Sequence, residues 1–199
     1  EYEFTGASST VRRVVAQLRQ SVPECFIPLT AAPGEQIQVD FGHAQVIIAG
    51  VNTKACLYCM RLKYSQVPFV VAFPTERLEA FIEGHVQGFA YFGGVPQQGL
   101  YDNAKTQVVK ILEGPNREEH EMFSSLRSHY LFDSHFCRPR RGNEKGAVEN
   151  LVKYVRQHTL VPVPAFENWE ELNAFLLKWC DQEKDKHQVE WAKEQQALR

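Results

Sequence analysis

The chain has 199 residues and a formal net charge of −2, with 44% apolar, 23% charged and 12% aromatic residues. This composition is typical of a globular protein and excludes a disordered or low-complexity chain, since 13 Phe, 7 Tyr and 3 Trp can build a sizeable core. The near-neutral net charge does not by itself indicate a nucleic-acid binder, so any basic surface must be local.

Segments that direct a chain into or across a membrane are not expected. No run approaches 18 consecutive apolar residues, and the first 20 residues lack the apolar segment of a signal peptide. The five Cys are irregularly spaced and odd in number, which favours a reducing, cytoplasmic environment over a disulfide framework. The sequence begins at Glu1 without Met and enters a patterned segment directly, so we expect an internal piece of a longer protein.

Residues 7–20 are predicted to form a short helix with Ser and Thr at its start as capping residues. Its apolar positions have helical spacing and form one stripe: Val11, Val14, Val15 and Leu18. Arg12 and Arg13 lie off that stripe, which suits a recognition helix in a DNA groove, although an amphipathic surface helix fits the pattern equally well. Residues 21–34 contain three Pro and end at Gly34, as expected of an extended linker.

From residue 36 the apolar period changes to two. Residues 36–42 alternate between apolar and polar positions, which predicts a strand with one buried face, and residues 44–49 continue it. A turn is expected at 50–52, followed by strands at 54–64 and 68–73. Because the connections are short, we expect an antiparallel meander.

The rest of the chain alternates helices with short strands. We expect helices at 76–92, 117–130, 143–158 and 168–184, strands at 98–102 and 134–138, and a linker at 161–165. The first of these helices should end at Gly93-Gly94. The order β-β-β-α-β-α-β-α predicts an α/β fold, a mixed five-stranded sheet with helices on its faces.

Three carboxylates are the candidate catalytic groups. Asp40 lies inside an apolar strand, Asp102 ends the fourth strand, and Glu149 lies on the helix after the fifth. Each has a plain structural alternative: an edge-strand Asp facing water, a turn residue, and a solvated helix face. If the first and fourth strands are neighbours, however, the three converge at one end of the sheet. Clustered carboxylates repel one another, and Mg²⁺ relieves that repulsion and can serve phosphodiester chemistry.

Basic residues are concentrated in and before the predicted helix that carries Glu149. Residues 138–156 contain six Lys or Arg against two Glu, a local net charge of +4. Lys145, Lys153 and Arg156 lie on the same helix face as Glu149, and three further bases precede the helix, Arg138, Arg140 and Arg141. Such a face suits a phosphate backbone that crosses an active site. Helix ion pairs of Glu149 with Lys145 and Lys153 account for only two of the bases.

Cys56 and Cys59 form a CxxC pattern inside a predicted strand. Residues three apart in a strand point to opposite faces, and no second pair completes a zinc site. We therefore expect two core cysteines here rather than a metal site.

Four ordered segments resemble the motifs of IstA-type insertion-sequence transposases, which belong to the retroviral-integrase-like DDE superfamily with its ribonuclease-H-like fold. They are QVDFG at 38–42, FGGVP at 92–96, YDNAK at 101–105 and GNEKGAVE at 142–149. The resemblance covers about residues 5–185. Residues 6–19 resemble the end of the family's helix-turn-helix. The gap between Asp102 and Glu149 is 46 residues, longer than is common in integrases, so we expect extra structure between 103 and 133.

The resemblance implies a DNA transposase core that uses two Mg²⁺ ions, with Mn²⁺ as a substitute, held by Asp40, Asp102 and Glu149. It implies DNA as the substrate, at element ends and target, with Lys153 and Arg156 as DNA contacts. It also implies a homo-oligomer (dimer or tetramer), an IstB-type AAA+ ATPase as partner, and a bacterial, nucleoid-associated location.

The expected domains are a truncated helix-turn-helix at 1–22, a linker at 23–34, the catalytic core at 35–160 and a linker with a C-terminal helical segment at 161–199. Two alternatives stay open: a ribonuclease-H-like nuclease without strand transfer, and a non-catalytic nucleic-acid-binding module.

Overall fold

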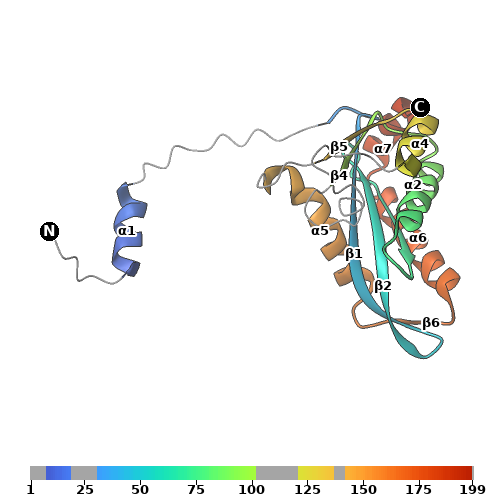
Figure 1. Cartoon of the computed structure of the whole chain (residues 1–199), viewed down its shortest axis with the longest axis horizontal. Helices are drawn as coiled ribbons and strands as arrows, with labels where there is room; N and C mark the ends of the chain where they lie inside the picture. Colours follow the sequence, from blue (N-terminus) through green and yellow to red (C-terminus); the bar gives the residue numbers. More distant parts are fainter. Residues whose placement is uncertain (1–7, 19–30, 102–120, 137–141, 199) are drawn as a thin grey trace.

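The computed structural model describes residues 8–18, 31–101, 121–136 and 142–198, with the backbone alone for 11, 13, 16–18 and 142–150. Within these ranges the chain forms a mixed sheet with helices on both faces (Figure 1). A helix near the N-terminus, α1 (Ser8–Leu18), precedes the sheet, as the capped apolar stripe predicts. None of the described helices is both long and apolar enough to cross a membrane.

The sheet begins with the predicted antiparallel meander. β1 (Gln36–Ile48) pairs with β2 (Val51–Leu62), which pairs with β3 (Pro68–Phe73). The β1–β2 turn needs only two residues, because Ala49 and Gly50 both have positive φ, 49° and 78°, and this conformation matches the twist of a hairpin. The predicted turn at 50–52 is therefore one residue late.

Two short strands extend the sheet on the other side of β1. β4 (Gln98–Tyr101) runs parallel to β1, and β5 (Asp133–Phe136) runs parallel to β4, giving the order β3-β2-β1-β4-β5. The predicted mixed five-stranded sheet is confirmed. A sixth strand, β6 (Ala165–Phe166), lies where a linker was predicted and pairs with the far end of β1.

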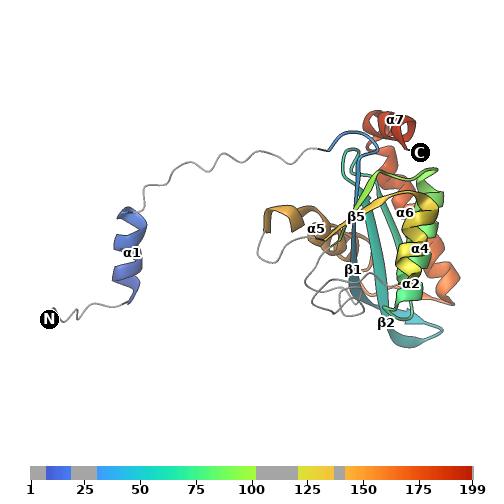
Figure 2. The ribbon, with the colours of Figure 1, turned by 45° about the horizontal axis from the view of Figure 1, so that its top comes forward.

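Helices cover both faces of the sheet. α2 (Leu78–Phe92) and α4 (Glu121–Tyr130) lie together on one side, and α5 (Gly142–Thr159) lies on the other (Figures 1 and 2). α2 ends as predicted, at Gly93 with φ 69°. α6 (Trp169–Asp185) packs with α5 in one of two apolar clusters, which contains Leu151, Val155, Leu172, Leu176 and Trp179.

The prediction that β1 has one buried face is wrong. Ile37 and Val39 face the cluster under α2 and α4, whereas Ala44 and Val46 face the cluster under α5 and α6. Both faces are covered because helices from the C-terminal half of the chain pack on the side that the alternation marks as polar. The polar residues Gln38 and Asp40 on that side of β1 are consequently interior residues, 2% and 8% exposed.

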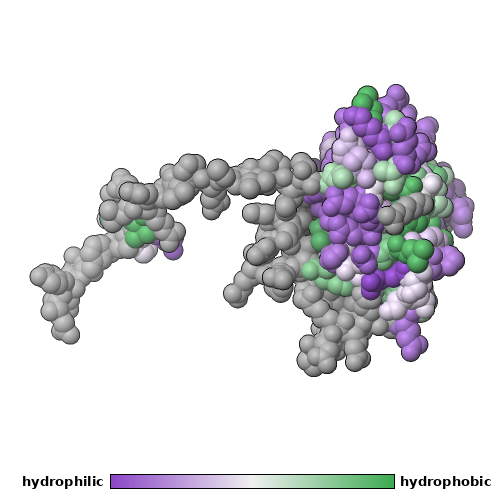
Figure 3. All heavy atoms as spheres, turned by 90° about the horizontal axis from the view of Figure 1, so that it is seen from above, coloured by the Kyte–Doolittle hydropathy of each residue, from purple (hydrophilic) through white to green (hydrophobic). Residues whose placement is uncertain are grey.

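A last helix, α7 (Gln188–Ala197), closes the end of the sheet where β1 begins. Its Glu194 is fully buried and accepts hydrogen bonds from the backbone N–H of Gly34 at 2.7 Å and of Ser65 at 2.6 Å. Trp191 packs on the apolar cluster under α2. The surface seen from this end is mostly hydrophilic, with small separate apolar patches (Figure 3).

Candidate active site

Asp40 lies in the central strand of the sheet. It is 8% exposed, and its Oδ1 accepts a hydrogen bond from the Phe41 N–H at 2.8 Å. Cys59 of β2 is its cross-strand neighbour. The alternative of an edge-strand Asp facing water is therefore wrong. β1 is a central strand, with β2 paired to one of its edges and β4 paired to the other. A carboxylate held inside a sheet is costly unless charge or hydrogen bonds compensate it.

The pairing of β4 with β1 places the last residue of β4 next to the residue that precedes Asp40. Tyr101, the last residue of β4, is paired in parallel with Val39 of β1. Asp40 follows Val39 in the sequence, and Asp102 follows Tyr101. Asp102 itself lies outside the described residues. The expectation that the first and fourth strands are neighbours is confirmed, and it is this neighbourhood on which the convergence of carboxylates depends.

α5 packs directly on β1 just beyond Asp40. Gly42 makes this possible, because a β-carbon there would overlap the side chain of Val152. The helix runs in the same direction as β1, since β6, which follows it, pairs with the last residues of that strand (Figure 1). Glu149 lies one helical turn before Val152, toward the Asp40 end of the strand. Only its backbone is described, so the convergence of the three carboxylates stays a prediction.

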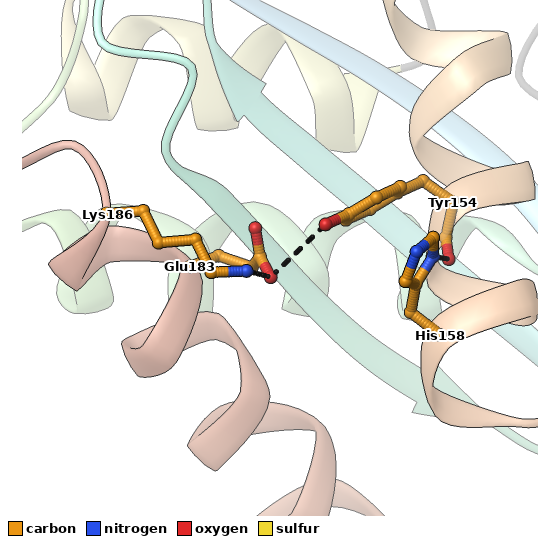
Figure 4. A network of polar contacts seen from close by, with 4 residues as sticks. All are labelled: Tyr154, His158, Glu183 and Lys186. Carbon is orange, nitrogen blue, oxygen red and sulfur yellow. Dashed lines mark hydrogen bonds and ion pairs between the residues drawn. The ribbon is translucent and has the colours of Figure 1, made fainter.

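A polar network holds α5 against α6 (Figure 4). The Tyr154 hydroxyl donates to Glu183 Oε1 at 3.5 Å, and Lys186 donates to the same oxygen. His158 Nδ1 lies 2.9 Å from the Tyr154 carbonyl, and the two rings are 3.9 Å apart. Glu183 is largely buried, so its charge is stabilised by these donors rather than by water. The network fixes the helix that carries Glu149.

Arg61 is a partly buried cation on β2. It lies opposite Gln38 in the β1–β2 ladder. Burial lowers the pKa of its guanidinium, and the charges of Cys59 and Glu183 oppose that shift. A cation is therefore present on the strand beside Asp40, within the electrostatic influence of Glu183.

The two Cys of the CxxC pattern point to opposite faces, as predicted. Cys59 belongs to the cluster under α5 and α6, whereas Cys56 pairs with His43 on the other face. Burial and, after it, the charge of Asp40 raise the pKa of the Cys59 thiol well above its usual range. Cys59 therefore stays a neutral neighbour of Asp40.

The predicted DNA-contact residues are described unevenly. Lys153 and Arg156 are exposed on α5, on the helix side that also carries Glu149, and Arg12 is exposed on α1. The side chains of Lys145 and Arg13 lie outside the described residues, as do three further predicted contacts, Arg138, Arg140 and Arg141.

Two buried side chains that meet near the end of β4, Tyr101 and His85, were not predicted as site residues. Tyr101 is 1% exposed, and its hydroxyl lies 3.0 Å from Nε2 of His85 on α2. His85 stands four residues after Phe81 and four before Phe89, so a histidine in a buried helical stripe was the available signal. The partner on β4 could not be found from that spacing.

Comparisons with known proteins agree with this arrangement. No family model matches the chain. A transposase of Aminobacter aminovorans is 37% identical over 155 residues, which are 78% of this chain and 30% of that protein. The transposase for insertion sequence element IS640 of Shigella sonnei is 32% identical over 96% of this chain and 61% of that protein. The transposase for insertion sequence element IS21 of Pseudomonas aeruginosa is 32% identical over 96% of this chain and 49% of that protein.

The chain thus covers only part of the length of these relatives, from 30% to 61%. Among solved structures, a cryo-EM structure of the simian T-cell lymphotropic virus intasome in complex with PP2A regulatory subunit B56 gamma matches with a TM-score of 0.50 and 18% identity, over 87% of this chain and 61% of that chain. The predicted resemblance and fold are confirmed: this chain is homologous to a segment of the insertion-sequence transposases and has a ribonuclease-H-like fold.

Proposed function

We propose that this chain is the catalytic core of a DNA transposase, with Asp40, Asp102 and Glu149 as its catalytic residues. The observation that carries the proposal is the pairing of Tyr101 with Val39, after which the chain continues to Asp102 and to Asp40 respectively. Neighbouring strands lie about 4.8 Å apart, so carboxylates that follow paired positions of parallel strands are close enough to bind the same cation. The contact of α5 with β1 at Gly42 supports a place for Glu149 beside them.

The donor set fits a hard divalent cation. Carboxylate oxygens are the ligands that Mg²⁺ and Mn²⁺ prefer, and a buried carboxylate such as Asp40 gains from a cation. Asp40, Asp102 and Glu149 would hold two Mg²⁺ ions, for which Mn²⁺ would substitute. When bound, two such ions supply an activated oxygen nucleophile and stabilise the leaving oxygen of a phosphodiester.

The proposed reaction has two steps. In the first, a water oxygen attacks the phosphorus at the end of the element, the bond from phosphorus to the 3′-oxygen breaks, and a free 3′-hydroxyl is left. In the second, that hydroxyl attacks a phosphorus atom of the target DNA, the bond from this phosphorus to the target's 3′-oxygen breaks, and the element is joined to the target while a target 3′-hydroxyl is released. The three carboxylates would hold the reacting groups in position for both steps. Asp40 lies on a central strand, and the hydrogen bond from Tyr154 to Glu183 connects α5, which carries Glu149, to α6.

DNA would lie along the exposed side of α5. Lys153 and Arg156 are exposed there, at positions four and seven after Glu149, and cations at these positions match a phosphate backbone. The bases around them are proposed to add contacts: Lys145, Arg138, Arg140 and Arg141.

α1, with Arg12 and Arg13, is proposed as the end of a DNA-binding domain at 1–22. A linker at 23–34 would join this domain to a core at 35–160, which is followed by a C-terminal segment at 161–199.

Function in the cell is proposed to require several copies of the chain. The resemblance to IstA-type transposases implies a homo-oligomer on DNA and an IstB-type AAA+ ATPase partner at the bacterial nucleoid. Both follow from that resemblance, and each is open to a direct assay: mass measurement with and without element-end DNA, and co-purification with the ATPase.

The test uses labelled DNA that carries the ends of the element encoding this chain, with Mg²⁺ or Mn²⁺, and a sequencing gel. We expect nicked and joined products from the unchanged chain, and neither from Asp40→Asn, Asp102→Asn or Glu149→Gln. Asp133→Asn is the matched control and should keep activity. Asp133 is the first residue of β5, at the end of that strand away from the proposed site, and its side chain is 80% exposed.

The pattern of products separates the alternatives. Nicks without joined DNA would support the ribonuclease-H-like nuclease, and DNA binding without metal-dependent nicks would support the non-catalytic module. Full activity of Asp40→Asn would contradict the proposed site.

A further inference from the structure

The hydrogen bonds of His85 define its protonation state. His85 is fully buried on α2, with Nδ1 2.8 Å from the Phe81 carbonyl oxygen and Nε2 3.0 Å from the Tyr101 hydroxyl. A carbonyl oxygen only accepts, so Nδ1 carries the proton and donates it, and Nε2 accepts from the hydroxyl. Burial lowers the pKa of His85 to about 4, which keeps the imidazole neutral near pH 7.

Aromatic rings surround this pair and leave it little freedom. The His85 ring lies 4.4 Å from Phe81, 5.5 Å from Tyr58 and 6.1 Å from Phe132, measured between ring centroids. The polar atoms of His85 and Tyr101 are therefore shielded from water. A hydrogen bond in such surroundings is directional, and its loss is more costly than the loss of one at the surface.

Tyr101 is held along its whole length. Its ring folds back over Gly99, where a β-carbon would overlap the hydroxyl, and packs against Phe123 and Phe136 with centroid distances of 5.5 Å each. Its backbone is paired with Val39. The His85 hydrogen bond thus fixes the side chain of the residue that ends β4.

The position of Tyr101 matters because Asp102 is the next residue of the chain. Because the backbone of Tyr101 is paired with Val39, it fixes the point from which the chain continues to Asp102. We propose that His85 is a positioning residue for the metal site: through the Tyr101 hydroxyl it fixes the end of β4 beside Asp40. This inference rests on the proposed function, since it concerns the same carboxylates.

The chemistry explains why a histidine occupies this place. A leucine or phenylalanine would fill the space between α2 and β4 but would allow Tyr101 to shift within the cluster. His85 bonds the helix backbone on one side and the strand side chain on the other, so it transmits the position of α2 to β4. Groups that hydrogen-bond directly to metal ligands change metal affinity about 10- to 100-fold when they are removed, and His85, which acts through Tyr101, should have an effect at the lower end of that range.

The test is a titration of the full chain with Mn²⁺, with free Mn²⁺ measured by electron paramagnetic resonance. Tyr101→Phe removes only the hydroxyl and His85→Leu removes the acceptor; each should raise the Kd for Mn²⁺ about 10-fold. In His85→Gln, Oε1 can accept near the place of Nε2, so most of the affinity should return. The double variant of His85→Leu and Tyr101→Phe should bind no more weakly than either single variant, since both remove the same bond.

Near-UV circular dichroism and urea unfolding of each variant confirm that binding is measured on folded protein. Tyr101→Phe keeps the ring and its packing, so it tests the bond even if His85→Leu does not fold. If Tyr101→Phe binds Mn²⁺ as tightly as the unchanged chain while Asp40→Asn does not, the role of His85 is refuted and the metal site stands. If Asp40→Asn also binds unchanged, the proposed function itself is wrong and this inference falls with it.

Discussion

The buried imidazole of His85 makes the stability of the fold depend on pH. Its pKa is about 4 in the folded chain, against a usual value of 6.5, because burial disfavours the charged form. Between these two values the unfolded chain binds a proton that the folded chain does not, so the free energy of unfolding falls as the pH falls through this window. At or above pH 7 the imidazole is neutral in both states and the penalty vanishes.

The magnitude follows from the two pKa values. Each pKa unit corresponds to about 1.4 kcal/mol, so the full penalty below pH 4 is about 3 kcal/mol. Between pH 7.5 and pH 5.0 the imidazole should account for a loss of about 2 kcal/mol. Urea unfolding at these two pH values measures the change, provided that the slope with urea concentration stays constant.

The comparison of variants isolates this group. His85→Gln has no titrating side chain and should lose about 2 kcal/mol less than the unchanged chain over the same pH interval. Tyr101→Phe is the matched control, since it keeps the buried imidazole and should keep the pH dependence. Equal losses in His85→Gln and the unchanged chain would show that burial of His85 does not shift its pKa, and the reasoning would be refuted.

Three further predictions test other parts of the molecule. Lys153→Ala and Arg156→Ala should each reduce the slope of log Kd for DNA against log salt concentration by about one, and an unchanged slope would place them away from DNA. The Tyr58 hydroxyl is buried and has no partner among the described residues, so Tyr58→Phe should preserve stability or raise it by about 1 kcal/mol in urea unfolding; a clear loss would reveal a partner. Glu194→Ala should cost roughly 2–5 kcal/mol, because two buried N–H groups lose their acceptor, whereas the exposed Glu190→Ala should cost almost nothing.

Local patterns predict most of the fold because they coincide with the packing. The apolar stripe of α2 and the apolar positions at the start of β1 correspond to faces that are buried in the structure, although the other face of β1 is buried as well. β6 escapes prediction because two residues carry no periodicity and depend entirely on the edge of β1. α7 escapes because it has no apolar stripe, and its buried anchor is the charged Glu194, whose partners lie 160 and 129 residues away.

The candidate site likewise contains residues that the sequence predicts and residues that it does not. Asp40 is recognisable because a carboxylate inside an apolar strand is unusual, whereas Asp102 and Glu149 become candidates only through the expected order of the strands, to which the resemblance adds its support. His85 was not recognisable as a site residue, since its role depends on the register that brings Tyr101 to α2. A single sequence carries the residue types of such a pair but not the distance between them.

The pairing of β1 has a consequence for the order of folding. Its contacts with β2 are local and need only a two-residue turn, whereas Val39 meets Tyr101 and Ile47 meets Ala165 only after long loops have closed. Loop closure costs entropy before these contacts compensate it, so the hairpin should form early and the pairing with β4 late. If the three carboxylates form the proposed site, they would come together only when folding is nearly complete, and a partly folded chain leaving the ribosome would have no assembled centre with which to cut the host's DNA.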